Sequence, residues 1–167
     1  SARLECFLRP NPIQSAHRFE DIAKSGNGCA TTASGEGYCW GGNLFGELGI
    51  GGTSRPEELP VRVPGSWAEL VAGTAWHTCG LTSDEYYNCW GWDVAGQASP
   101  PSTGSSEGVS AGFDFSCGIA LWGHWECWGF GADDALSPPS SIYSHSVSAG
   151  WDHACGVDTY YDVDCWG

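Results

Sequence analysis

Hydrophobic positions along this chain gather in short stretches, and four of these stretches end in the same three residues. The tripeptide Cys-Trp-Gly closes at Gly41, Gly91, Gly129 and Gly167. Side chains alternate between the two faces of a strand, so each cysteine and the tryptophan that follows it point to opposite faces. Stacked hairpins of this kind bury both faces between neighbours. The pattern therefore predicts short aromatic β-strands arranged as a repeat.

The spacing of the cysteines supports hairpins. Eight of the nine cysteines form pairs with nine residues between the two members. This interval fits two short strands and a turn, whereas zinc knuckles separate their ligands by only about two to four residues. Cysteines that face each other across an antiparallel hairpin are close enough to bond. We therefore expect four disulfides, with buried free thiols as the alternative. The expected pairs are Cys29 with Cys39, Cys79 with Cys89, Cys117 with Cys127, and Cys155 with Cys165.

The cysteine pairs also delimit the domain. The four hairpins occupy residues 23–41, 71–91, 110–129 and 148–167. We expect a repeat domain over 23–167, with residues 1–22 outside it. Cys6 has no partner in the pattern and is either bonded to another chain or segment, or free. The only helix-permissive stretch lies around His17 to Lys24, and Val61 with Val63 indicates an outer strand in the first connector.

Two stretches carry a more specific pattern. Residues 39–49 read CWGGNLFGELG, and residues 71–91 contain Ala-Gly followed by His77-Thr78-Cys79. They resemble the regulator-of-chromosome-condensation repeat, in which Ala-Gly, His-Thr-Cys-x-Leu and a strand ending in Trp-Gly precede Asn-x-x-Gly-Gln-Leu-Gly. The resemblance covers the chain from Ala23 onward and is degenerate in the last two connectors, where Gly96-Gln97-Ala98 is a remnant.

The resemblance implies a fold. The family fold is a β-propeller, usually of seven blades with four antiparallel strands each, and only four repeats are visible here. It implies an all-β, propeller-like array of about four blades. Such an array is either a closed ring or an incomplete propeller that a partner completes. An open array exposes unpaired or apolar blade faces at both ends, which favours association with another copy.

Charge and cysteine content restrict the cellular compartments and the classes of partner that we expect for this chain. The formal net charge is −14, with 20 acidic and 6 basic residues, so we expect no nucleic-acid partner. No apolar run reaches the roughly 18 residues that cross a bilayer, so we expect no membrane insertion. Disulfides form in oxidising compartments, so we expect an extracellular or cell-surface location. The start at Ser1 fits either a removed signal peptide or a fragment of a longer protein.

Candidate catalytic and metal-ligating groups are few. His77 and His153 occupy equivalent repeat positions and would bind a metal only if they converged, whereas a structural role is the commoner one for such a position. Asp114, Asp152 and the acidic residues near the end match no calcium-loop spacing and indicate a solvated acidic face. With the cysteines committed to bridges and no nucleophile motif present, we expect no enzyme activity, metal or cofactor.

Surface positions supply the remaining candidates. Trp92, which opens a connector, and Trp122, at a hairpin tip, are candidates for contact with a glycan or a protein. Two serine- and proline-rich loops are candidates for O-glycosylation. Their residues are Ser99, Pro100, Pro101, Ser102, Thr103, Ser137, Pro138, Pro139 and Ser140.

These observations favour a non-enzymatic extracellular module that associates with copies of itself or with another extracellular protein in a larger surface or filamentous assembly. The alternative is a secreted binding module, either a lectin that recognises carbohydrate or a protein inhibitor like some secreted members of the family. Nucleotide exchange on a small GTPase, the family's best-known activity, belongs to a reducing compartment and does not fit a disulfide-bonded chain.

Overall fold

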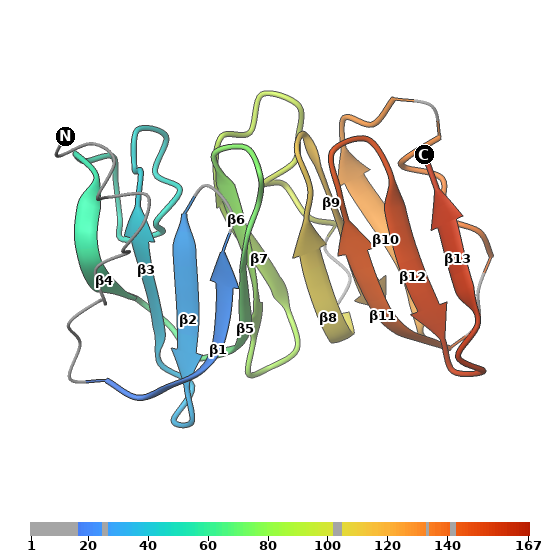
Figure 1. Ribbon diagram of the computed structural model, residues 1–167, viewed down its shortest axis with the longest axis horizontal. Coiled ribbons are helices and arrows are strands. Elements are labelled where there is room, and N and C mark those ends of the chain that lie inside the picture. The colour runs from blue at the N-terminus through green and yellow to red at the C-terminus, as the bar shows by residue number, and fades with distance from the viewer. Residues whose placement is uncertain (1–16, 25–26, 102–104, 133, 141–142) are drawn as a thin grey trace, which may run out of the picture.

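The computed structural model describes residues 17–24, 27–101, 105–132, 134–140 and 143–167, and every helix or strand in these ranges is a β-strand. The strands form four antiparallel sheets, which we call blades 1 to 4 in chain order (Figure 1). Their bounds are β1 (Phe19–Lys24), β2 (Gly28–Thr32), β3 (Gly37–Gly41) and β4 (Glu57–Val63) in blade 1; β5 (Trp67–Ala72), β6 (His77–Thr82) and β7 (Tyr87–Gly91) in blade 2; β8 (Ser105–Ala111), β9 (Phe115–Ala120) and β10 (His124–Gly129) in blade 3; and β11 (Ser144–Ala149), β12 (Ala154–Asp158) and β13 (Val163–Trp166) in blade 4. The all-β expectation is confirmed.

The second and third strands of each blade form the hairpin that the cysteine spacing predicts. In all four blades the two cysteines of a pair lie directly opposite in register. Their Cα atoms are 4.0–4.1 Å apart, and all four pairs form disulfides. Each bond closes a loop with a sequence separation of 10, for which the chain-entropy model gives at most about 3 kcal/mol of stabilisation. The bridges therefore fix register within a blade.

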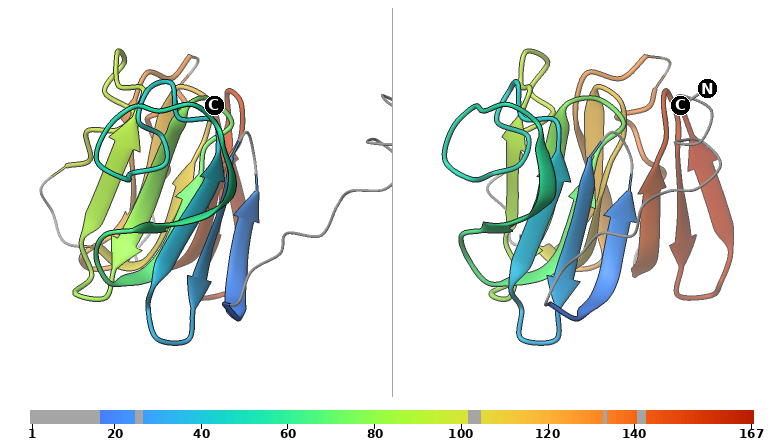
Figure 2. Two further views of the ribbon diagram at one scale, coloured as in Figure 1. Left: turned by 90° about the vertical axis from the view of Figure 1, so that its left-hand side faces the viewer. Right: turned by 60° about the vertical axis from the view of Figure 1, so that its left-hand side comes forward.

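The blades lie in a row rather than in a closed ring. Figure 1 shows blades 1 to 4 in chain order along the longest axis, with β1–β4 at one end and β11–β13 at the other. Seen from the blade 1 side, the sheets stand one behind another and face each other (Figure 2). Within the described residues, the array therefore has two end blades, each with one face that no other described blade covers.

Three seams hold neighbouring blades together, and each seam is built from the same parts. Between blades 1 and 2, the Cys29–Cys39 bond packs with Trp67, Leu70 and Trp90. In the same way, the Cys79–Cys89 bond of blade 2 packs with Trp128 of blade 3. The Cys117–Cys127 bond of blade 3 packs with Trp166 of blade 4. Each seam thus joins the disulfide of one blade to the Cys-Trp-Gly tryptophan of the next, so the core is built collectively.

The N-terminal part of blade 1 is a strand, although the sequence around His17 to Lys24 permits a helix. Residues Phe19–Lys24 form β1, which pairs antiparallel with β2. A helix of this length is marginal in water, whereas pairing with β2 satisfies the backbone of the segment. β1 also extends across the domain boundary expected between residues 22 and 23. The outer strand expected at Val61 and Val63 is present as β4, whereas Cys6 lies outside the described residues.

Candidate interaction surfaces

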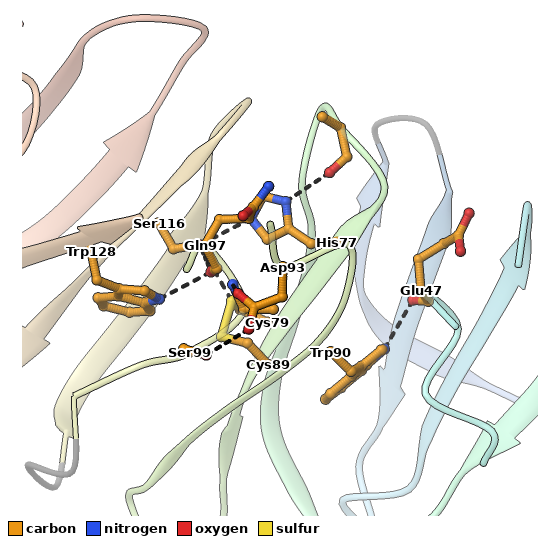
Figure 3. Close-up of a disulfide and its surroundings, with 12 residues drawn as sticks. Glu47, His77, Cys79, Cys89, Trp90, Asp93, Gln97, Ser99, Ser116 and Trp128 are labelled. Carbon is orange, nitrogen blue, oxygen red and sulfur yellow. Dashed lines mark hydrogen bonds between the residues drawn. A yellow bond between two sulfur atoms is a disulfide. The ribbon is translucent and has the colours of Figure 1, made fainter. Parts of the chain in front are cut away.

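His77 begins β6 and is buried at the seam between blades 2 and 3. Its Nδ1 lies 2.7 Å from the Ala75 carbonyl oxygen and its Nε2 lies 3.0 Å from Ser116 Oγ (Figure 3). Burial lowers the pKa of His77, and this effect outweighs the Ala75 hydrogen bond and the charges of Asp114 and Asp93, which raise it. A neutral, buried, hydrogen-bonded ring is a structural element of the seam.

The equivalent His153 has a different environment. It is exposed, and its Nδ1 lies 3.0 Å from Asp152 Oδ1. The structure therefore does not bring His77 and His153 together. Across the part of the chain that the structure describes, no group of three or more His, Cys, Asp or Glu side chains is arranged to hold a metal ion.

Each seam also contains a directional hydrogen bond. Trp128 Nε1 donates to the carbonyl of the fully buried Gln97, at 3.0 Å, and Ser116 Oγ lies 3.0 Å from the same oxygen (Figure 3). In the other two seams, Trp90 Nε1 donates to the Glu47 carbonyl at 2.9 Å and Trp166 Nε1 to the Ala135 carbonyl at 3.1 Å. The indole of one blade therefore always bonds to the connector of the preceding blade. The sequence analysis identified the tryptophans but not their acceptors. Glu47, Gln97 and Ala135 each lie eight residues after the second cysteine of a pair, so aligning the connectors on the cysteines would have indicated them.

The first open surface, which we call the indole end, belongs to blade 1. Cys39 faces blade 2, so Trp40 faces away from it. The Trp40 ring lies over Gly28, where a Cβ atom would fall within 2.3 Å of it, and 6.2 Å from the ring of Phe19. Trp40 is half-buried, and among the described residues its Nε1 has no hydrogen-bond acceptor. The indole end thus presents the same tryptophan that, in blades 2 to 4, is seated in a seam.

The second open surface, which we call the disulfide end, belongs to blade 4. Trp166 packs against blade 3, so Val163 and Cys165 face away from it. Cys165 is exposed and Cys155 is half-buried, whereas Cys29 and Cys117 are fully buried. Val163 is 66% exposed. The disulfide end thus exposes a disulfide of the kind that packs against a tryptophan in each of the three seams.

The two ends differ in charge. All six lysine and arginine residues lie between Arg3 and Arg62, and residues 63–167 contain thirteen acidic residues and no lysine or arginine. Blade 4 contains Asp152, Asp158, Asp162 and Asp164 and no lysine or arginine. The chain is therefore close to neutral around blade 1 and strongly acidic from blade 2 onward.

A third surface lies at the end of the blades that carries the β5–β6, β8–β9 and β11–β12 loops. We call it the loop-end aromatic surface, and its residues are Phe45, Trp76, Trp92, Phe113 and Trp151. The Phe45 ring is 4.5 Å from Trp92 and 5.5 Å from Trp76, between ring centroids. Phe113 stacks on Trp151 at 3.9 Å, and Trp151 is 65% exposed. The sequence does not show this grouping because the residues come from five separate loops.

The two tryptophans singled out from the sequence lie far apart. Trp92 belongs to the loop-end aromatic surface and is half-buried beside Phe45 and Trp76. Trp122 lies in the β9–β10 turn, at the opposite end of the blades, and is 81% exposed with a φ of 75°. A single ligand of ordinary size cannot contact both, so they belong to different surfaces.

The serine- and proline-rich loops are partly described. Ser99 is exposed, but its hydroxyl donates to Asp93 Oδ2 at 2.6 Å. Ser137, Pro139 and Ser140 are exposed, and Pro100, Pro101 and Pro138 are half-buried. Ser102 and Thr103 lie outside the described residues. Glycosylation of these loops remains a prediction, and at Ser99 it would replace the hydrogen bond to Asp93.

The described residues were also searched for helices that could cross a membrane. No helix among them is long and apolar enough to cross a bilayer.

Glu69 in β5 is half-buried, and burial raises the pKa of its carboxyl group. The hydrogen bond from the Val109 amide to Glu69 Oε2, at 3.3 Å, opposes this effect. The nearby charge of Asp21 raises the pKa further.

Comparisons with known proteins extend these observations. No family model matches the chain. The Ultraviolet-B receptor UVR8 of Arabidopsis thaliana is 35% identical over 92 residues, which are 52% of this chain and 21% of that protein. The match supports the resemblance that the Cys-Trp-Gly and His-Thr-Cys motifs indicate.

Solved structures share the fold. The CRINKLY WD40 ectodomain of the Arabidopsis thaliana receptor kinase ACR4 superposes with a TM-score of 0.69 and 25% identity, covering 95% of this chain and 56% of that one. Yeast RCC1 (Prp20), solved bound to Kap60, superposes with a TM-score of 0.73 and 17% identity, covering 93% and 45%. This chain therefore spans about half the length of these propeller structures and about a fifth of UVR8.

Proposed function

We propose that this chain, which is built from repeats of the regulator-of-chromosome-condensation family, is a non-enzymatic extracellular module that assembles with copies of itself or with another extracellular protein. The observation that carries the proposal is the seam that recurs between blades, in which the disulfide of one blade packs with the Cys-Trp-Gly tryptophan of the next. Within the described residues, the indole end and the disulfide end each present one half of such a seam. Exposed faces of this kind favour association.

The extracellular location is supported by the covalent structure. Four disulfides closed within single hairpins do not persist in a compartment that keeps thiols reduced. The ACR4 structure that shares the fold is an ectodomain. Both observations fit a protein that acts outside the cell.

The proposal that the chain is not an enzyme is supported by the contacts of its histidine, aspartate and cysteine side chains. His77 is buried, lies within hydrogen-bond distance of Ala75 and Ser116, and has a lowered pKa. Asp93 accepts hydrogen bonds from the Ala98 amide and the Ser99 hydroxyl, which shape its own connector. The cysteines of the four pairs are bonded to each other. These groups are therefore occupied in maintaining the fold.

Sedimentation velocity tests the proposal. Protein produced in an oxidising compartment, with its four bridges verified by mass spectrometry, is examined from about 1 to about 100 μM. We expect the weight-average mass to rise with protein concentration. We expect this rise to involve no disulfide between copies through Cys6 that a reductant would break. A mass that stays monomeric throughout, both alone and with extracellular proteins from the native source, contradicts the proposal.

A second candidate function is recognition of a carbohydrate or a protein segment at the loop-end aromatic surface. The specific observation in its favour is the stack of the exposed Trp151 on the half-buried Phe113, which lies beside the exposed Asp152. Aromatic faces next to hydrogen-bond acceptors suit sugars and protein anchors. A glycan array with tryptophan fluorescence titration tests it: the signal should be lost in Trp151→Ala and kept in Trp122→Ala. A chain whose fluorescence no glycan changes lacks the lectin function.

A further inference from the structure

We infer that a cavity between blades 1 and 2 binds the cationic end of a lysine or arginine side chain from a protein partner, with the Glu47 carboxylate as its counter-charge. The inference rests on the proposed role in protein assembly and adds the chemistry of one contact to it. The cavity lies between the β3–β4 connector and the β5–β6 loop, so it does not depend on either end face of the array.

The cavity has room for the end of one side chain. Its volume is about 170 Å³, several times the roughly 30 Å³ that one water molecule occupies in the liquid. A Cβ atom at Gly42 would lie 3.2 Å from Glu47 Oε1 and 3.5 Å from Asn27 Oδ1, so both oxygens border the space that this glycine leaves free. The lining residues on the blade 2 side are Gly73, Thr74, Trp76 and His77.

Glu47 brings a carboxyl group to this cavity with one oxygen unused. Glu47 is only 2% exposed, and its Oε2 accepts a hydrogen bond from the Phe45 amide at 2.7 Å. The carboxyl group points away from the Trp90 indole, which the Glu47 backbone carbonyl accepts (Figure 3). Among the described residues, no donor or basic side chain contacts Oε1. A buried carboxylate without a cation is unfavourable, and a cation in the cavity supplies the missing partner.

The next seam shows the same position with a neutral side chain. Gln97, like Glu47, lies eight residues after the second cysteine of its pair. Its Oε1 accepts a hydrogen bond from the amide two residues earlier, at 2.9 Å, as Glu47 Oε2 does. The remaining Nε2 of Gln97 lies 3.5 Å from Asp114 Oδ1. Trp76 has the place of Asp114 in blade 2, three residues before the first cysteine. The Gln97 amide thus faces a carboxylate, whereas the Glu47 carboxylate shares its cavity with an indole and lacks a donor.

The surroundings of the cavity favour an organic cation. Trp76 borders it and is 55% exposed, and the face of an indole attracts ammonium and guanidinium groups. Burial lowers the pKa of His77, which also borders the cavity, and the charges of Asp114 and Asp93 oppose this effect. Both carboxylates therefore also attract a cation placed in the cavity. Residues 63–167 contain no lysine or arginine that would compete for it.

Other classes of occupant fit less well. A calcium ion takes roughly six to eight oxygen ligands, whereas one wall of this cavity is an indole, which is no ligand for such an ion. A neutral sugar would leave the Glu47 carboxylate without a counter-charge. The side chains of lysine and arginine supply both the charge and an apolar stem that packs against Trp76.

A titration followed by nuclear magnetic resonance tests the inference. Isotopically labelled protein with its four bridges formed is titrated with blocked peptides Gly-Gly-X-Gly-Gly, in which X is lysine, arginine or norleucine. Peptides reach about 20 mM, because a single side chain binds with a dissociation constant on the order of millimolar. The reporters are the Phe45 amide, which donates to Glu47, and the Trp76 indole. Calcium chloride is titrated in a separate arm.

Two matched variants show whether the Glu47 charge is responsible. Glu47→Gln removes the charge and keeps an acceptor for the Phe45 amide, and Gln97 shows that a glutamine is compatible with this position. Glu58→Gln, at an exposed position on β4, removes the same charge elsewhere and is the control. Circular dichroism and disulfide mapping verify that both variants are folded.

We expect the lysine and arginine peptides to shift both reporters and the norleucine peptide to shift neither. The tighter of the two cationic peptides identifies the preferred side chain. In Glu47→Gln the dissociation constant should rise at least about tenfold, while Glu58→Gln should bind normally.

Three outcomes overturn the inference: equal shifts with norleucine, equal affinity in Glu47→Gln, or shifts with calcium chloride and none with the peptides. The proposed function is judged separately by sedimentation. A chain that assembles but binds no cationic peptide retains the proposed function and lacks this site. A chain that binds the peptides through Glu47 but forms no assembly retains the site and contradicts the proposed function.

Discussion

Trp128 in blade 3 donates its indole hydrogen to the backbone carbonyl of Gln97, which belongs to the connector of blade 2, at 3.0 Å. Its ring packs in the same seam as the Cys79–Cys89 bond. A tryptophan meets both requirements because it offers a large apolar ring and one hydrogen-bond donor. The Cys-Trp-Gly motif is therefore a joint between blades as well as the closing strand of a hairpin.

Trp128→Phe separates the two contributions at this joint. It keeps most of the apolar ring and removes the donor, so the free energy of unfolding should fall by about 1–2 kcal/mol. Urea denaturation with the disulfides intact measures the change. Trp122→Phe, whose side chain is 81% exposed, should change stability by less than about 0.5 kcal/mol. Equal effects of the two substitutions would show that the joint contributes nothing.

The glycine that ends the motif is required by two constraints, which two alanine variants distinguish. Gly129 has a φ of 109°, and a Cβ there would lie 2.6 Å from the Asp114 carbonyl oxygen. Gly51 has a φ of 93° but no atom within 4 Å of its Cβ position. Gly51→Ala should therefore cost about 1 kcal/mol from backbone strain alone, and Gly129→Ala at least about 2 kcal/mol because backbone atoms must move. Denaturation curves compare them, and a smaller cost at Gly129 would refute the close approach.

The buried imidazole of His77 should make stability depend on pH. Its pKa in the folded chain lies below the usual value of 6.5, so the unfolded chain binds the proton first. Stability is then fully present above about pH 6.5 and is lost as the pH falls towards the folded pKa. Phe115 occupies the equivalent position in blade 3 and is buried, so His77→Phe should remove this loss between about pH 7 and pH 5. Chemical denaturation at both values measures it.

The exposed His153 provides the control for the pH experiment. His153→Phe should leave the His77-dependent loss of stability in place. An unaltered pH dependence in His77→Phe would mean that other groups govern stability in this range.

The four disulfides should differ in their sensitivity to reductants. Thiol–disulfide exchange needs access to a sulfur atom, and Cys165 is exposed whereas Cys29 and Cys39 are fully buried. Limiting dithiothreitol followed by alkylation and mass spectrometry should therefore label Cys155 and Cys165 first. Labelling of Cys29 and Cys39 ahead of them would contradict the exposure of the disulfide end.

The hairpins follow from features that are local in the sequence. The parts of the fold that the sequence did not predict depend on contacts between segments that are distant in the sequence. The pairing of Cys117 with Cys127 follows from a short interval and a repeated motif, so their opposition in register was predictable. β1 was not, because its strand state comes from pairing with β2 and not from its own residues. The confirmed family resemblance predicted propeller-like blades, but it did not indicate which face of an end blade stays open.

The same distinction applies to the candidate surfaces. Trp92 was identified as a surface residue, yet Phe45 and Trp76 cover part of it, and they reach it from two other loops. The exposure of Val163 could not be inferred from its apolar side chain, since it depends on the position of blade 4 in the row. Contacts between loops and position within the array arise only from tertiary packing.

The seams described above all join blades that are consecutive in the chain, and each hairpin is closed by its own covalent bond. Damage from a substitution is accordingly confined to one or two neighbouring modules. Duplication or loss of a whole module during evolution would lengthen or shorten the molecule by one step while every surviving joint kept its geometry.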